Sequence, residues 1–159
     1  MEVPSRFPVL VGVGVGSRRE GDDALGVEAA ELMTRAVEAA AEDTGAPDLA
    51  AAVEQIAVPQ GTWSYPDPGR LVAARIGATG ARTVLVDLGI PQQSIVNEAL
   101  RSILTGTLDV AVVVGGEAKG YEARADHWSE GGLWELRPLK AFAWSVFPDD
   151  MTRFRFDRA

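Results

Sequence analysis

Short apolar runs rich in β-branched residues alternate along the chain with longer amphipathic segments. Four such runs predict buried strands, over residues 9–15, 54–58, 82–88 and 109–116. Between them, apolar side chains recur at three- and four-residue steps, as in amphipathic helices, over residues 24–44, 70–76 and 92–104. The regular alternation of strands and helices predicts an α/β fold, with a mostly parallel sheet, right-handed crossovers and helices on both faces.

Proline, glycine and aspartate mark the ends of these helices. Asp22 or Asp23 is placed to cap the first helix and to favour the positive end of its dipole. Gly45 follows the same helix at its other end. Pro68 suits a first helical position, and Gly77 ends the short helix that begins there.

The character of the chain changes after Lys119. Residues 121–159 are rich in tryptophan, and within them residues 141–147 predict a further strand and residues 152–156 an edge strand. We therefore divide the chain into an α/β domain, residues 1–120, and a Trp-rich extension, residues 121–159, that packs on this domain or extends it.

Composition narrows the range of partners. The 159 residues are 47% hydrophobic and carry a formal net charge of −8, which argues against binding to nucleic acid or to an anionic membrane surface. No apolar run is long enough to cross a membrane, and the first residues lack the basic flank and apolar stretch of a signal peptide. The cytoplasm is the expected compartment.

Cysteine is missing from the sequence, and His127 is the single histidine. This excludes disulfides, Cys-ligated metals and a thiol nucleophile within the chain. A His-based metal site or a Ser–His triad would depend on His127 alone, which lies in a polar stretch typical of surface residues. We predict no metal site.

The glycines near the N-terminus invite two functional interpretations. Residues 12–17 follow a predicted strand, as a dinucleotide fingerprint does, but Ser17 stands where the third glycine belongs and no acidic residue follows the second strand. Residues 21–26, Gly-Asp-Asp-Ala-Leu-Gly, resemble the turn of hydrogenase maturation proteases. Gly16 or Ser17 replaces the asparagine of that family, and its acidic and histidine nickel-sensing residues are missing.

Three stretches in combination carry a more specific resemblance. They are the opening run 8–14, the segment Trp-Ser-Tyr-Pro-Asp-Pro-Gly-Arg-Leu-Val-Ala at 63–73, and residues 97–118, which end in Val-Val-Val-Gly-Gly-Glu-Ala. Together they resemble actinobacterial acetyl-CoA acetyltransferase-like proteins and sterol-carrier-type thiolases, over roughly residues 6 to 120. The resemblance implies a three-layer thiolase-like half-fold with a mostly parallel mixed sheet.

The same resemblance indicates what thiolase chemistry would require. Thiolases place a nucleophilic Cys at the start of the helix before the fourth strand, and here that position falls at about Gly89. Family members also carry a second half whose His and second Cys act as bases, and we expect this chain to lack it. The resemblance therefore implies a non-catalytic subunit or acyl-CoA-binding partner in acyl-CoA or lipid metabolism, including that of steroids.

The resemblance also implies a ligand, partners and candidate binding residues. The ligand is a coenzyme A thioester, with no covalently bound cofactor, and the partner is a second copy or another thiolase-like or acyl-CoA-binding chain. The residues assigned to substrate binding are Trp63, Tyr65, Gln92, Ser94, Gly115, Gly116 and Glu117. For the two aromatic residues the alternative role is to cap the core.

Three other functions stay open from the sequence. One is an acyl-CoA retro-aldolase working with a partner chain, in which Tyr65, Ser94 or His127 would carry protons. The second is a hydrolase of the hydrogenase-maturation type. The third is a gene relic that folds and binds nothing.

Overall fold

The computed structural model describes residues 6–17, 26–87, 89–118 and 151–154. Within these ranges the helices are α1 (Ala29–Asp43), the short 3-10 helix η1 (Pro47–Ala52), α2 (Pro68–Ile76) and α3 (Gln92–Leu104). The strands are β1 (Gln55–Pro59), β2 (Arg82–Val86), β3 (Ala111–Val113) and β4 (Met151–Phe154).

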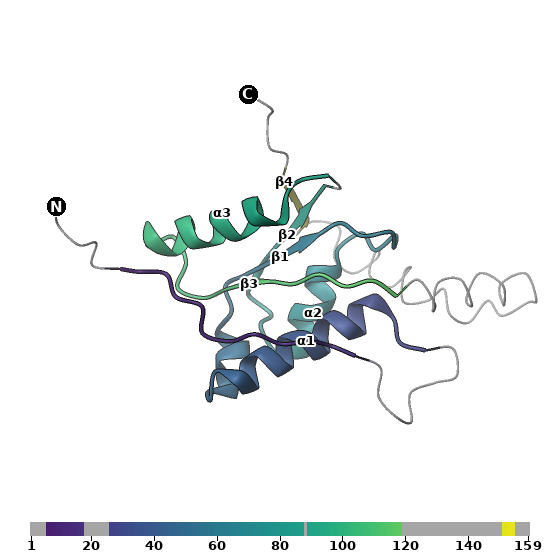
Figure 1. The fold of residues 1–159 in the computed structure, drawn as a ribbon, viewed down its shortest axis with the longest axis horizontal. Helices are drawn as coiled ribbons and strands as arrows, with labels where there is room; N and C mark the ends of the chain where they lie inside the picture. The colour runs from purple at the N-terminus through teal and green to yellow at the C-terminus, as the bar shows by residue number, and fades with distance from the viewer. Residues whose placement is uncertain (1–5, 18–25, 88, 119–150, 155–159) are drawn as a thin grey trace, which may run out of the picture.

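The strands form one parallel sheet in the order β3-β1-β2-β4. Ile56 of β1 is in register with Thr83 of β2 on one side and with Val112 of β3 on the other. The edge strand β4 is parallel to β2. Helices α1 and α2 lie on one face of this sheet and α3 lies on the other (Figure 1). The three-layer α/β arrangement predicted from the sequence is confirmed.

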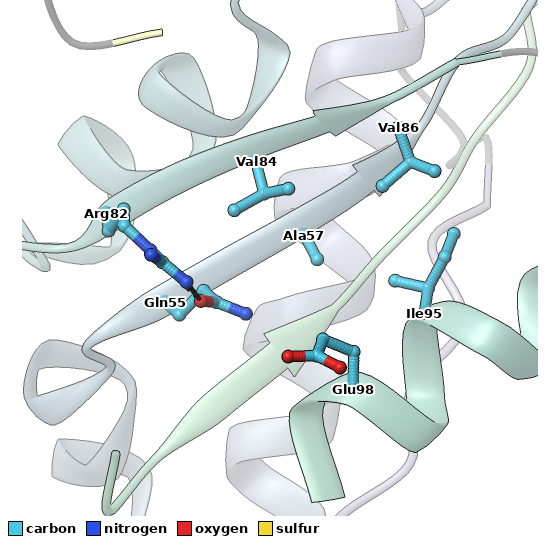
Figure 2. A pocket seen from close by; sticks show the side chains of 7 residues that line it. All are labelled: Gln55, Ala57, Arg82, Val84, Val86, Ile95 and Glu98. Carbon is cyan, nitrogen blue, oxygen red and sulfur yellow. Dashed lines mark hydrogen bonds between the residues drawn. The ribbon is translucent and has the colours of Figure 1, made fainter. Parts of the chain in front are cut away.

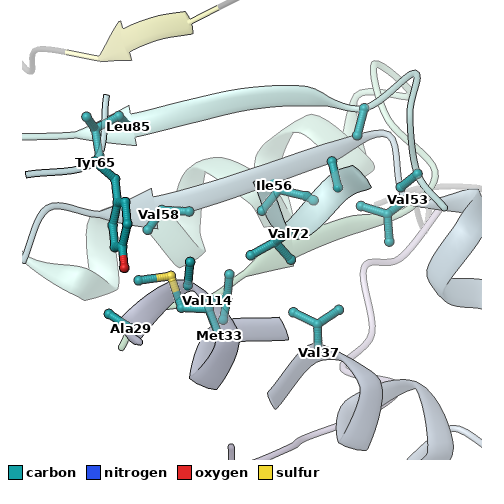
Figure 3. Close-up of a cluster of buried hydrophobic side chains, with 14 of the residues drawn as sticks. Ala29, Met33, Val37, Val53, Ile56, Val58, Tyr65, Val72, Leu85 and Val114 are labelled. Carbon is teal, nitrogen blue, oxygen red and sulfur yellow. The ribbon is translucent and has the colours of Figure 1, made fainter. Parts of the chain in front are cut away.

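Alternation along the strands divides the core between the two faces. Ile56, Val58 and Leu85 point toward α1 and α2, where they pack with Met33 and Val72 in the larger cluster (Figure 3). A smaller cluster on the other face consists of Ala57, Val84, Val86 and Ile95, with Ile90 packed against it. The main core therefore lies between the sheet and α1 and α2, and α3 covers a smaller apolar area.

The predicted strand over residues 9–15 is wrong. Residues 6–17, which we call the strap, contain no helix or strand and lie along α1 (Figure 1). The four valines at positions 9, 11, 13 and 15 are 54–81% exposed, whereas the alternating glycines face the helix. The run has the two-residue period of a strand. Its packing on a helix comes from the glycines, which let backbone approach backbone.

The strap and α1 match in spacing. A Cβ added to Gly12, Gly14 or Gly16 would lie 1.9–2.1 Å from the carbonyl oxygens of Ala40, Ala36 and Leu32, respectively. Two residues of extended chain advance ~6.6 Å, and four helical residues advance ~6.0 Å. Every second strap residue therefore meets every fourth helix residue, and only glycine leaves room at these contacts.

Substituting Gly14 with alanine is expected to detach the strap from α1. The new Cβ would lie 2.1 Å from the oxygen of Ala36 and 2.3 Å from the nitrogen of Ala40, both of them helix backbone that cannot move aside. Amide hydrogen exchange should show faster exchange at Val13, whose N–H donates to Asp43, and faster proteolysis within 6–17. Gly80→Ala is the control, since no atom lies within 4 Å of the position that its Cβ would take. Unchanged exchange at Val13 would contradict the packing described.

The other elements agree closely with the sequence prediction. Helix α3 has the predicted bounds, α2 begins at Pro68, and Gly77 ends it with φ 81°. Helix α1 begins at Ala29, and its N-cap residue, Glu28, makes no capping hydrogen bond with its side chain. The two aspartates predicted to cap this helix, Asp22 and Asp23, lie outside the described residues. Strand β3 is shorter than predicted, at three residues. The predicted strand 141–147 lies outside the described residues, and β4 covers most of the predicted edge strand.

Candidate functional site

The loops that follow β1, β2 and β3 meet at one edge of the sheet. Parallel strands place their carboxyl ends on the same side, where open α/β sheets bind their ligands. The Gln60 N–H donates to the carbonyl of Val86 at 2.8 Å, and the Val114 N–H donates to Ala57 at 3.0 Å, so the three loops begin side by side. All the residues that the sequence assigned to substrate binding lie in these loops or in the first turn of α3.

Trp63 and Tyr65 are buried in the loop after β1, being 4% and 7% exposed. The Trp63 Nε1–H donates to the carbonyl of Gly116 at 2.9 Å, and the Tyr65 hydroxyl donates to Glu28 at 3.1 Å. Their ring centroids are 5.5 Å apart with the planes inclined at 41°. Both aromatic side chains therefore cap the core, and their polar atoms join this loop to the segment after β3 and to the start of α1.

Glu117 makes a second connection between the same two loops. Its carboxylate accepts from the N–H of Thr62 at 2.9 Å and from the Thr62 hydroxyl at 2.7 Å. A Cβ added to Gly61 would lie within 2.5 Å of both the Glu117 carboxylate and the Trp63 indole nitrogen, so a larger residue here would displace one of these side chains. The sequence prediction named Glu117 but missed Thr62, its partner.

Gly89, Gln92 and Ser94 occupy the neighbouring loop and the beginning of α3. Gly89 is exposed with φ 96°, and nothing lies within 4 Å of the position that a Cβ would take there. Pro91 is the N-cap residue of α3, and no side chain makes a capping hydrogen bond there. The Ser94 N–H donates to the carbonyl of Pro91 at 2.9 Å. The structure thus brings Trp63, Tyr65, Gly115, Gly116 and Glu117 into two joined loops, and places Gly89, Gln92 and Ser94 at the adjacent helix start.

Asp67 holds the loop between Tyr65 and α2 in place. This carboxylate is 2% exposed and accepts from the Arg70 N–H at 2.9 Å, as the N-cap of α2, and from the Thr83 hydroxyl at 2.8 Å. Thr83 is in β2, so the loop, the helix and the sheet meet at one side chain. Sequence reasoning did not single out Asp67, although an aspartate directly before a proline at the first helical position is a capping signal.

A small cavity lies elsewhere, between the sheet and α3. Figure 2 shows its lining residues, Gln55, Ala57, Arg82, Val84, Val86, Ile95 and Glu98. Its volume is about 20 Å³, enough for about one water molecule. It includes none of the predicted binding residues and has no room for a coenzyme A thioester.

Two further features bear on the predictions from composition. Within the described ranges, no group of three or more His, Asp or Glu side chains is arranged to hold a metal ion. Likewise, none of the helices described is long and apolar enough to cross a membrane.

Comparison with known proteins gives a likeness in structure. No family model matches the chain, and no curated protein matches it. Among solved structures, it is similar to a monomeric SCP2-thiolase-like protein type 1 from Mycobacterium smegmatis, with 30% sequence identity and a TM-score of 0.57. The match covers 74% of this chain and 24% of that protein.

The chain therefore has a thiolase-like fold, as the resemblance of its sequence implied. It spans about a quarter of the length of the similar protein.

Proposed function

We propose that this chain is a non-catalytic thiolase-like subunit that binds an acyl-CoA thioester and supplies no nucleophile. The observation that carries the proposal is the combination of a thiolase-like fold with a sequence that contains no cysteine; the resemblance of the sequence implies that the nucleophile position falls at about Gly89. Its setting would be acyl-CoA or lipid metabolism, with the cytoplasm as the expected compartment.

The geometry at Gly89 supports the non-catalytic part of this proposal. A positive φ of 96° favours glycine and strains other residues. A thiolate nucleophile would need an L-residue at this point and a base within reach. Tyr65, which could carry a proton, is buried with its hydroxyl donating to Glu28, and His127 lies outside the described residues.

The loops at the carboxyl ends of the strands support the binding part. Gly115, Gly89 and Gln92 are exposed there, and α3 begins without a side-chain cap. The backbone N–H groups of Gln92 and Gln93, at the start of its first turn before Ser94, can donate hydrogen bonds to phosphate or thioester oxygens. Trp63 and Glu117 would act by fixing the shape of the loops, because their polar atoms are engaged inside the fold.

The experiment measures acyl-CoA binding by calorimetry and acetoacetyl-CoA thiolysis for the full chain and for Gly89→Cys. We expect both proteins to bind acetoacetyl-CoA and neither to catalyse thiolysis. The new thiol should react with iodoacetamide, since the space around Gly89 is open, and the strained φ should lower stability by about 1–2 kcal/mol. Gly80→Cys is the matched control for an exposed thiol.

Three outcomes would contradict the proposed function or the result expected from it. Thiolysis by the unmodified chain would overturn the non-catalytic claim. Thiolysis gained only in Gly89→Cys would show that bases lie within reach of this position, and would contradict the expectation that neither protein is active, while the unmodified chain would still lack a nucleophile. No detectable binding of acetoacetyl-CoA would remove the ligand from the proposal.

A further inference from the structure

The small cavity between the sheet and α3 has one apolar wall and one polar wall. The apolar wall is made of side chains of the smaller core cluster. The polar wall is made of Gln55 at the start of β1, Arg82 at the start of β2 and Glu98 in α3 (Figure 2). Cavities that stay dry are lined by apolar groups alone. The three polar side chains therefore decide what this cavity binds.

The Gln55 side chain is buried, with 4% of its surface exposed, and its amide has a fixed orientation. Its Oε1 accepts from the Arg82 Nε–H at 3.1 Å and also from Nη2 of the same guanidinium. A guanidinium can only donate, so the amide oxygen must face Arg82 and the amide nitrogen must face away from it. Among the described residues, this nitrogen donates to no protein atom. A buried amide group in this position requires an acceptor.

Glu98 brings an acceptor to the opposite side of the cavity. It lies one helical turn after Ile95, the α3 member of the smaller cluster, so it is on the side of the helix that meets the sheet. Its side chain is half-buried. The Gln55 amide nitrogen is on the side of this carboxylate (Figure 2), and no hydrogen bond joins the two groups. A polar pair separated in this way is a usual place for a bridging water.

We propose that the cavity is a binding site for one ordered water, which accepts from the Gln55 amide nitrogen and donates to the Glu98 carboxylate. The volume of about 20 Å³ admits about one water. The lining also selects a neutral molecule that both donates and accepts. A cation would meet the Arg82 guanidinium and the amide N–H groups, and an anion would meet the Glu98 carboxylate.

The water gives α3 a second attachment to the sheet. Ile95 is the single α3 residue in the smaller cluster, and the bridge adds a polar contact one turn further along the helix. It joins the middle of α3 to the first residue of β1. This inference concerns the packing of α3 and does not depend on acyl-CoA binding.

The test is NMR of the isotope-labelled full chain, reading NOE and ROE cross-peaks between water and the Gln55 side-chain amide. A long-lived water gives cross-peaks of opposite sign in the two experiments, whereas surface water does not. We expect this signature in the unmodified chain and in Glu98→Gln, which keeps an acceptor, and its loss in Glu98→Leu. Glu38→Leu, at an exposed position of α1 on the other face of the sheet, is the matched control and should retain it. Circular dichroism establishes that each variant is folded.

Unfolding equilibria supply a second readout. Gln55→Leu and Glu98→Leu each remove one partner of the same water, so the two losses should not add. In the double variant the unfolding equilibrium constant should be about threefold or more below the value that independent effects predict. Additive losses would overturn the proposal. So would the absence of the water signature in the unmodified chain, with or without coupling, or its persistence in Glu98→Leu. None of these readouts uses acetoacetyl-CoA, so a negative result would leave the proposed function standing.

Discussion

Replacing Trp63 with alanine should lower the free energy of unfolding by about 3–5 kcal/mol, the usual cost of removing a buried tryptophan side chain. Trp63 is 4% exposed within the larger core cluster, and its indole N–H bonds to Gly116 across two loops. The substitution removes both the packing and the bond. Urea unfolding followed by circular dichroism measures the change, with the slope checked for two-state behaviour.

Trp63→Phe separates the two contributions. Phenylalanine keeps most of the apolar contact but leaves the Gly116 carbonyl without its donor, so we expect a loss of about 1–3 kcal/mol. If Trp63→Ala costs less than Trp63→Phe, or if both are neutral, the indole does not hold the loops together. Either result would make Trp63 a candidate ligand-binding side chain again.

How far the sequence predicted the fold can be judged from two runs with the same apolar character. Residues 82–88 and 9–15 both read as buried strands, and only the first contains a strand, β2. The difference lies in Gly12, Gly14 and Gly16, whose spacing matches the carbonyls of Leu32, Ala36 and Ala40. Such a contact depends on which helix lies nearby, and no local pattern reports that.

The candidate site likewise has one part that the sequence predicted and another that it could not predict. The sequence identified the loops that meet at the carboxyl ends of the strands, because parallel topology follows from the alternation of elements. It could not tell that Tyr65 points to Glu28, 37 residues earlier, or that Glu117 reaches Thr62, 55 residues earlier. Side-chain partners so far apart along the chain are decided by packing, and their identities carry no periodic signal.

Asp67→Ala is expected to destabilise the chain by about 1.5–5 kcal/mol. Loss of the N-cap of α2 contributes about 0.5–2 kcal/mol. The Thr83 hydroxyl, which is buried in β2 beside it, loses its acceptor and adds about 1–3 kcal/mol. The exposed fractions of the two side chains, 2% and 1%, mean that water cannot readily replace the carboxylate. Thermal unfolding of the full chain measures the loss.

Asp67→Asn and Thr83→Val test whether the two contacts act together. Asparagine can still accept from the Arg70 N–H and can donate to the Thr83 oxygen, so it should restore much of the stability lost in Asp67→Ala. Thr83→Val removes the hydroxyl with little change of shape. In the double variant Asp67→Ala/Thr83→Val, the combined loss should fall short of the sum of the single losses, since no buried hydroxyl remains unsatisfied. Additive losses would show that Asp67 serves α2 alone, and the loop that carries Tyr65 would then depend on its own packing.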